Sequence, residues 1–262
     1  MTGAAGSIGR VVTVGLVARG HEVVSLDRVP EPDGNETPFH TVDCADPDAV
    51  AAVVAEERPD GVVHLAGIPD ETGLPDALTS HVITTAALLD AMVEHDVRRL
   101  VLASSNHAVG RTPRRELLTV RTRPRPDTFY GVGKVAAEAL SSLYADRYGL
   151  DVVACRIGSF GPRPETVRQL STWLSPADCL RMVDAALTAT APGFAVLHGI
   201  SANTRGWWDL EPGRALGYEP QDDAEDFAPS VAGSVEDDWD GAHVGGPFAT
   251  STYHRPALDR RP

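Results

Sequence analysis

Tyr130 and Lys134 are the two residues whose types and spacing best fit a chemical step. They lie four positions apart at the start of an expected helix, so their side chains share one face of it. An ammonium group beside a phenol stabilises the phenolate and lowers the phenol pKa, which makes the tyrosine a usable general base. Lys134 is also the only lysine among 23 lysine and arginine residues. The pair predicts removal of a proton from a hydroxyl group.

Ser105 ends the strand expected before this helix and can hydrogen-bond the same phenol oxygen. An isolated tyrosine–lysine pair at this spacing also occurs on exposed helix surfaces, where it does no chemistry. Here the pair follows a strand that ends in two serines, in a chain that opens with a glycine-rich turn. We therefore expect Ser105, Tyr130 and Lys134 to be the catalytic residues.

The glycine-rich turn stands at the start of the chain, in the sequence MTGAAGSIGR. Between a buried strand and a helix, such a turn lets backbone N–H groups and the helix N-terminus bind a dinucleotide's pyrophosphate. Only Met1 stands in the place of that strand, so we expect the first strand to be truncated and the natural protein to begin about five to ten residues earlier. The residues expected at the pyrophosphate are Gly3, Gly6, Ser7, Ile8 and Gly9.

Asp27 ends the second expected strand. A carboxylate at this place accepts hydrogen bonds from the adenosine ribose hydroxyls and repels a 2′-phosphate, which favours NAD over NADP. The neighbouring Arg28 keeps NADP open as an alternative. The other residues expected to bind the cofactor are Asp43, Cys44, Ala66, Gly67, Tyr130 and Lys134.

Apolar β-branched runs alternate with helical patterns along most of the chain, which is typical of βαβ units. The alternation predicts an α/β fold with a Rossmann-like, doubly wound parallel sheet and a small C-terminal substrate lobe. Residues 1–157 are expected to bind NAD, residues 158–220 to form the substrate lobe, and residues 221–262 to form an irregular acidic tail. Strands are expected at 21–27, 41–43, 61–67, 99–105, 151–157 and 194–198, and helices at 8–19, 47–57, 76–95, 129–148 and 176–189.

The composition argues against several kinds of partner. A net charge of −14 disfavours nucleic-acid binding. No apolar run is long enough to span a bilayer, and no basic, apolar-cored leader opens the chain. The three cysteines lie far apart without a CxxC pair, as expected for reduced thiols, and no metal site is predicted. We expect a cytoplasmic protein with neither nucleic acid nor membrane as a partner.

These motifs resemble those of the extended short-chain dehydrogenases/reductases, the NAD-dependent epimerase/dehydratase family, and within it most of all the uronate dehydrogenases. The resemblance implies NAD-dependent oxidation of the C1 hemiacetal of a hexuronate, galacturonate or glucuronate, to an aldarolactone. It also implies a homo-oligomer, because helices 76–95 and 129–148 resemble those that pair subunits in this superfamily. It covers nearly the whole chain and rests on SSNH at 104–107, YGVGK at 130–134, RIGS at 156–159, RQLSTW at 168–173, SAN at 201–203 and GWWD at 206–209.

The resemblance also implies a role for each site residue. Tyr130 would take the C1 hydroxyl proton, Ser105 would position that hydroxyl, and Lys134 would hold the nicotinamide ribose. Arg168 would bind the C6 carboxylate, for which a planar guanidinium is well suited; the alternative is a solvated loop cation. For His107 the alternative to substrate binding is a packing role. The residues expected to bind substrate are Ser105, Asn106, His107, Ser159 and Arg168.

Three residues depart from the family pattern. Pro69 stands where relatives carry a serine, His81 where extended enzymes usually carry asparagine, and Gly133 where serine or threonine is usual. Two other functions stay open. One is an NAD-dependent sugar or sugar-phosphate dehydrogenase of the glucose 6-phosphate type, with Arg168 on the phosphate. The other is a non-catalytic NAD-binding protein, although such proteins commonly lose the tyrosine–lysine pair.

Overall fold

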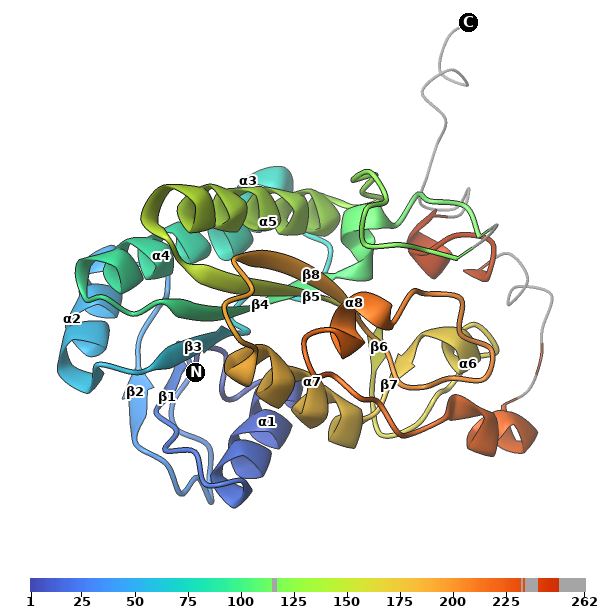
Figure 1. The fold of residues 1–262 in the computed structure, drawn as a ribbon, viewed down its shortest axis with the longest axis horizontal. Coiled ribbons are helices and arrows are strands. Elements are labelled where there is room, and N and C mark those ends of the chain that lie inside the picture. The colour runs from blue at the N-terminus through green and yellow to red at the C-terminus, as the bar shows by residue number, and fades with distance from the viewer. Residues whose placement is uncertain (115–116, 232, 234–239, 250–262) are drawn as a thin grey trace, which may run out of the picture.

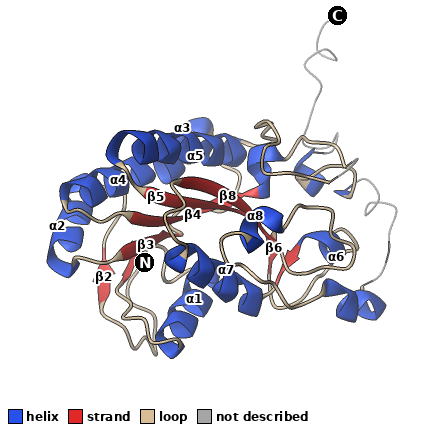
Figure 2. Cartoon of the chain, viewed as in Figure 1, coloured by secondary structure: helices blue, strands red, loops and turns tan. Residues whose placement is uncertain are grey.

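The expected strands pair in parallel in the computed structural model, which describes residues 1–114, 117–231, 233 and 240–249. Four of them form a sheet in the order β3-β4-β5-β8, and β1 pairs with β2 beside it. Figure 2 shows the strands as a central layer with helices on both sides. The strands are β1 (Ser25–Asp27), β2 (Phe39–Thr41), β3 (Gly61–His64), β4 (Arg99–Ser105), β5 (Asp151–Ile157) and β8 (Phe194–Gly199).

Met1 and Thr2 fill the position between β1 and β3, where the first strand of a dinucleotide-binding sheet is expected. Thr2 forms parallel bridges with both Leu26 and His64. Its backbone N–H donates to the carbonyl of Val63 at 2.9 Å, and the Met1 carbonyl accepts from the N–H of Leu26 at 2.7 Å. Two residues therefore join the β1–β2 pair to the four-stranded sheet.

The helices lie close to their expected bounds, with one exception. The helix expected at 76–95 is interrupted by a π-helical segment, Thr79–Ile83, between α3 (Leu74–Leu78) and α4 (Thr84–Glu94). Side chains cap several helices: Asp46 and Ser175 accept from first-turn N–H groups, as these residue types favour. The other long helices are α1 (Ser7–Ala18), α2 (Pro47–Glu57), α5 (Phe129–Tyr148) and α7 (Pro176–Thr188).

Three strand predictions need correction. The strand expected at 21–27 is confined to β1, because its partner β2 begins at Phe39, opposite Ser25. The strand expected at 41–43 lies two residues earlier, since Asp27 pairs with Thr41 at the end of that ladder. The strand expected at 61–67 ends at His64, after which the chain turns towards the glycine-rich loop.

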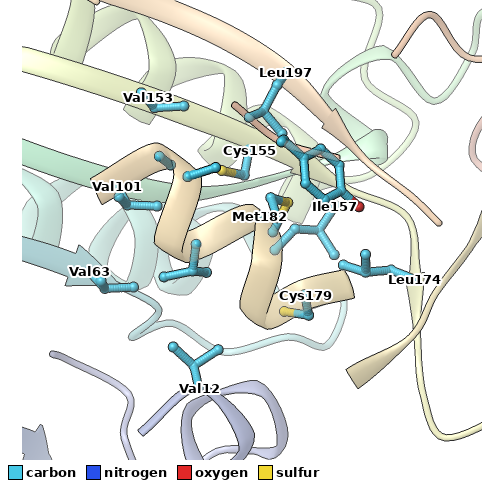
Figure 3. Close-up of a cluster of buried hydrophobic side chains, with 14 of the residues drawn as sticks. Val12, Val63, Val101, Val153, Cys155, Ile157, Leu174, Cys179, Met182 and Leu197 are labelled. Carbon is cyan, nitrogen blue, oxygen red and sulfur yellow. The ribbon is translucent and has the colours of Figure 1, made fainter. Parts of the chain in front are cut away.

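Alternating side chains of the strands supply two hydrophobic layers, one on each face of the sheet. Val62, Leu100 and Val152 pack against α2, α4 and α5. The next residues, including Val63 and Val101, face the opposite way and pack against α1 and α7. Figure 3 shows this second cluster, with valines of neighbouring strands directed towards the α7 ribbon. Burial on both faces explains why the strands read as continuous apolar runs.

The C-terminal region packs beyond the ends of β5 and β8 (Figure 1). The indole of Trp173 is buried against Phe227, and Trp208 is equally buried. Where it is described, the region expected as a tail is irregular, but Ala224 and Val244 are fully buried, so it is built into the body of the protein. The elements here are β6 (Ser159–Phe160), α6 (Gln169–Thr172), β7 (Trp173–Leu174), α8 (Glu211–Arg214) and the 3₁₀ helices Ala224–Ser230 and Gly246–Ala249. Across the described ranges, no helix is both long and apolar enough to cross a membrane.

Candidate active site

The glycine-rich turn connects Thr2 to α1, and two of its glycines are required by close approaches. A Cβ on Gly3, which has φ +68°, would lie 2.7 Å from the backbone of Leu65 and Ala66. A Cβ on Gly9 would lie 2.2 Å from the Gly3 carbonyl oxygen. At Gly6 a Cβ would meet a single atom within 4 Å, the Gly3 carbonyl oxygen at a tight 3.3 Å, and Gly6 lines the neighbouring groove. The turn is therefore tight where helix meets strand and open where a phosphate would approach.

The N-terminus of α1 is suited to an anion. It begins at Ser7 after Gly6, and no side chain in the described part of the chain caps it. Its first N–H groups and the positive end of the helix dipole therefore face the turn. Ser7 and Ile8 open this helix, as the sequence predicts for residues at a pyrophosphate.

A groove of about 430 Å³ runs from the turn along the ends of β1, β2 and β3. Asp27 stands at its side and fixes the turn by accepting a hydrogen bond from the N–H of Ala5 at 3.0 Å. Thr2 supports the opposite wall, because its hydroxyl contacts Nδ1 of His64 at 2.7 Å and accepts from the N–H of Ala66 at 3.2 Å. The sequence-predicted residues that line the groove are Gly3, Gly6, Asp27, Asp43, Cys44, Ala66 and Gly67. Its lining of turn glycines and strand-end carboxylates suits the adenosine and pyrophosphate parts of a dinucleotide, whereas Ser7, Ile8, Gly9, Tyr130 and Lys134 do not line it.

The expected catalytic residues come together where β4 meets α5. The Ser105 hydroxyl lies near enough to the Tyr130 phenol to lower its pKa, and it accepts from the N–H of His107 at 3.2 Å. Lys134 places its Nζ 5.4 Å from the centroid of the Tyr130 ring and donates from it to the Ala103 carbonyl at 2.7 Å. Ser105 at the end of β4 and the Tyr130–Lys134 pair of α5 thus form one cluster at the carboxyl end of the sheet.

Two side chains cap the N-terminus of α5, one through a hydroxyl and the other through a carboxylate. Thr128 accepts from the N–H of Gly131 at 2.8 Å. Glu71, which comes from a distant loop, accepts from the N–H groups of Phe129 and Tyr130 at 2.9 and 3.1 Å. These caps satisfy backbone donors that the first helical turn leaves free, and they fix the backbone of Tyr130.

The pKa of Tyr130 differs from the sequence-based expectation of a lowered value. Burial raises the phenol pKa above its ordinary value, and the Ser105 hydrogen bond only partly opposes this. Burial also lowers the pKa of Lys134 to about 8, against the opposing effect of Glu138. The ammonium is nevertheless the main form below pH 8, so its positive charge remains beside the phenol.

A buried ion pair lies beneath Lys134, one helical turn along α5. The Arg156 guanidinium donates from Nε and Nη2 to the two oxygens of Glu138, at 3.0 and 2.8 Å. Ser104 donates to the same carboxylate. Lys134, Glu138 and Arg156 together carry a net positive charge. Glu138 and Arg156 are almost fully buried. The pair positions the face of α5 that carries the lysine.

The residues expected to bind a sugar acid also converge. Nη1 of Arg168 lies 3.4 Å from the Ser159 hydroxyl, and its Nη2 donates to the carbonyl of Val244 at 2.6 Å. The Asn106 amide donates to that same carbonyl at 3.0 Å. Burial lowers the pKa of Arg168 to about 10, so the guanidinium stays charged at neutral pH.

His107 joins this cluster to Tyr130. Its Nδ1 lies 2.9 Å from the buried carboxylate of Asp127, which fixes the ring. The ring meets Tyr130 edge-on with centroids 5.8 Å apart, and it meets Phe248 in the same way at 5.1 Å. The expected sugar-binding residues therefore lie next to the Ser105–Tyr130–Lys134 cluster.

The segment around Val244 forms a wall of the site that the sequence analysis missed. A Cβ on Gly245 would overlap the Asp127 carboxylate, at 1.6 Å from Oδ2. A Cβ on Gly246, which has φ +63°, would lie 2.4 Å from Nε of Arg168. Two adjacent glycines beside apolar residues in an otherwise acidic region were the available signal. Glu71, Asp127 and Glu138 were missed because nothing in their local sequence reveals these long-range contacts.

Comparison with known proteins gives a consistent result. The chain matches the profile of the NAD dependent epimerase/dehydratase family over residues 1–187. A uronate dehydrogenase of Pseudomonas syringae pv. tomato is 34% identical over 96% of this chain and 92% of its own. An NAD-dependent glucose-6-phosphate dehydrogenase of Haloferax volcanii is 33% identical, over 87% and 94%. A crystal structure of uronate dehydrogenase from Agrobacterium tumefaciens, a tyrosine-to-alanine mutant complexed with NAD, matches with a TM-score of 0.88 and 36% identity over 97% of both chains.

Glu138→Gln should lower the free energy of unfolding by about 3–5 kcal/mol, because it leaves the Arg156 charge buried without its partner. Urea denaturation measures the loss. The matched control is Glu94→Gln, at an exposed position near the end of α4, which should change stability little. Equal effects of the two substitutions would contradict the structural role of the pair.

Proposed function

The chain belongs to the NAD-dependent epimerase/dehydratase family, and from this premise we propose that it is an NAD-dependent oxidoreductase acting on a hexuronate. The reaction is oxidation of the C1 hemiacetal of galacturonate or glucuronate to an aldarolactone, with reduction of NAD+. The observation that carries the proposal is the convergence of two clusters: Ser105, Tyr130 and Lys134 adjoin the Arg168 guanidinium and its polar neighbours.

The cofactor is proposed to lie in the groove beside the glycine-rich turn. The N–H groups at the start of α1 would bind the pyrophosphate, and Gly6 leaves the space for it. Asp27 would accept hydrogen bonds from the adenosine ribose, and its charge disfavours the 2′-phosphate of NADP. Bound NAD+ supplies the hydride acceptor.

Proton removal is assigned to Tyr130. Its phenolate takes the proton of the C1 hydroxyl, and the Ser105 hydroxyl orients that group. Because burial raises the pKa of Tyr130, the positive charge of Lys134 is needed to keep the phenolate accessible. Lys134 would also hold the nicotinamide ribose.

The substrate is proposed to bind between the sheet and the C-terminal segments. Arg168 would bind the C6 carboxylate, while Asn106, His107 and Ser159 would bind sugar hydroxyls. In this arrangement residues 1–157 hold the cofactor, and residues 158–220 together with 240–249 complete the sugar site. Oxidation of a sugar phosphate is the second candidate, favoured by the similar Haloferax volcanii enzyme, since Arg168 suits phosphate as well.

Tyr130→Phe should reduce kcat for uronate oxidation by about 10²–10⁴-fold, because it removes the proton acceptor. The binding constant for NAD+, measured by calorimetry, should change little, since the ring is kept. Tyr148→Phe on the exposed end of the same helix is the matched control. Wild-type turnover in Tyr130→Phe would remove this residue from the mechanism.

Arg168→Lys should raise KM for galacturonate and glucuronate, because an ammonium cannot bind a carboxylate through two parallel hydrogen bonds. We expect a rise of about tenfold, equivalent to roughly 1.4 kcal/mol, while the exposed control Arg163→Lys leaves KM unchanged. NADH formation at 340 nm with both uronates and glucose 6-phosphate provides the measurement. Turnover of glucose 6-phosphate alone would favour the second candidate.

We also propose a homo-oligomer that works in a reducing compartment such as the cytoplasm. All three cysteines are free and buried, in keeping with such a compartment. Large apolar side chains are exposed on the adjoining elements α3, Thr79–Ile83 and α5, where a second copy would cover them: Leu74, Leu78, Ile83 and Phe129. Light scattering after gel filtration should give a multiple of the chain mass; the mass of one chain would refute the assembly.

A further inference from the structure

His81 lies on the π-helical segment Thr79–Ile83 and packs directly against the tyrosine of the site. Its side chain is buried, and its ring meets the Tyr130 ring edge-on with centroids 4.9 Å apart and planes at 88°. Nε2 lies 3.1 Å from the carbonyl oxygen of Ile68. A carbonyl only accepts, so Nε2 carries the proton and donates it to this bond. The imidazole is thereby fixed in position and orientation.

Two glycines make the space that this ring occupies. A Cβ on Gly67 would lie 2.7 Å from Nδ1 and Cε1 of the imidazole. A Cβ on Gly133 would lie 3.0 Å from its Cδ2 and 3.1 Å from its Cβ, and also 3.1 Å from the carbonyl oxygen of Ala77. A side chain at position 133 would therefore crowd the imidazole, whose other edge is already close to the Gly67 backbone.

The imidazole of His81 carries no charge, so it acts on Tyr130 through packing. Burial and the nearby Lys134 lower the pKa of His81 to about 3, so the ring is neutral throughout the working pH range. Its Nδ1 is buried and has no hydrogen-bond partner among the described residues. The ring of His107 makes a second edge-on contact with Tyr130. Two imidazoles therefore pack against the phenol ring.

The two unusual residues of the sequence are thus in contact with one another. His81 and Gly133 are two of the three positions at which the sequence departs from the pattern that the resemblance implies. A bulky ring at position 81 beside a residue without a side chain at position 133 is the pairing that close packing requires.

We propose that His81 is a positioning residue for Tyr130, and that it can take this place only because residue 133 is glycine. The inference rests on the proposed function insofar as Tyr130 is the base. In this proposal, His81 and Gly133 together hold the Tyr130 phenol in line with the substrate hydroxyl.

The test is a double-mutant cycle of Gly133→Ser, His81→Asn and the two combined, with Ala139→Ser as the control. Ala139 lies on the exposed face of the same helix. Replacing glycine within a helix normally stabilises it, so a loss at position 133 reports the collision with His81. Gly133→Ser should lower the unfolding midpoint and reduce kcat between about ten- and a hundredfold, since a misplaced reacting group is costly. Adding His81→Asn should restore the unfolding midpoint and bring kcat back to the value of His81→Asn alone.

His81→Asn alone separates positioning from general stability. It should lower kcat several-fold, while KM for the uronate and the dissociation constant for NAD+ remain within about twofold of the wild-type values. If Gly133→Ser equals the wild type, or if His81→Asn fails to rescue it, the proposal is wrong. If the wild type oxidises none of the sugars, the proposed function fails, whereas the pairing of His81 with Gly133 is still decided by the unfolding midpoints.

Discussion

The positive charge of Lys134 beside the half-buried Tyr130 phenol is the interaction on which the proposed site depends. Burial opposes this interaction in two ways. Burial raises the pKa of Tyr130, and it lowers the pKa of Lys134 to about 8. The lysine is held by the Ala103 carbonyl, and the carboxylate of Glu138 one turn away supports its charge. Arg156 neutralises most of that carboxylate, so the buried group as a whole keeps an excess of positive charge near the phenol.

The parallel sheet brings the separate parts of the site to one edge. β4 and β5 pair over their full lengths, so Ser105 ends beside Ile157, just before the segment that carries Ser159. Met1 and Thr2 hold the glycine-rich turn at the same edge through bonds to both neighbouring strands. The segment around Val244 closes the remaining side by contacts with Asn106 and Arg168. The cofactor groove, the phenol and the guanidinium are therefore arranged along one line of strand ends.

Sequence reasoning was most successful where local patterns are strong. The bounds of β4, α5 and β5 match those predicted from the sequence. For α5, the signals are the capping Thr128 before its first residue and Gly149, with φ +71°, after its last. The π-helical segment could not be foreseen from the helical pattern; it carries His81, whose ring packs beside Tyr130 and the Gly67 turn. The direction of the Tyr130 pKa was wrong for a related reason: the spacing of two residues reveals their proximity and says nothing of how deeply they are buried.

The pH dependence of kcat tests the central claim most directly, with wild-type protein and Lys134→Met compared on the same uronate. In the proposed mechanism the phenolate is the active form, so kcat should rise with pH as the phenolate fraction grows. Below pH 8, where Lys134 keeps its positive charge, removing that charge should lower the phenolate fraction and kcat by about 10- to 100-fold at each pH. Equal kcat values for Lys134→Met and wild type below pH 8 would show that the lysine does not control the phenol, and would contradict the account.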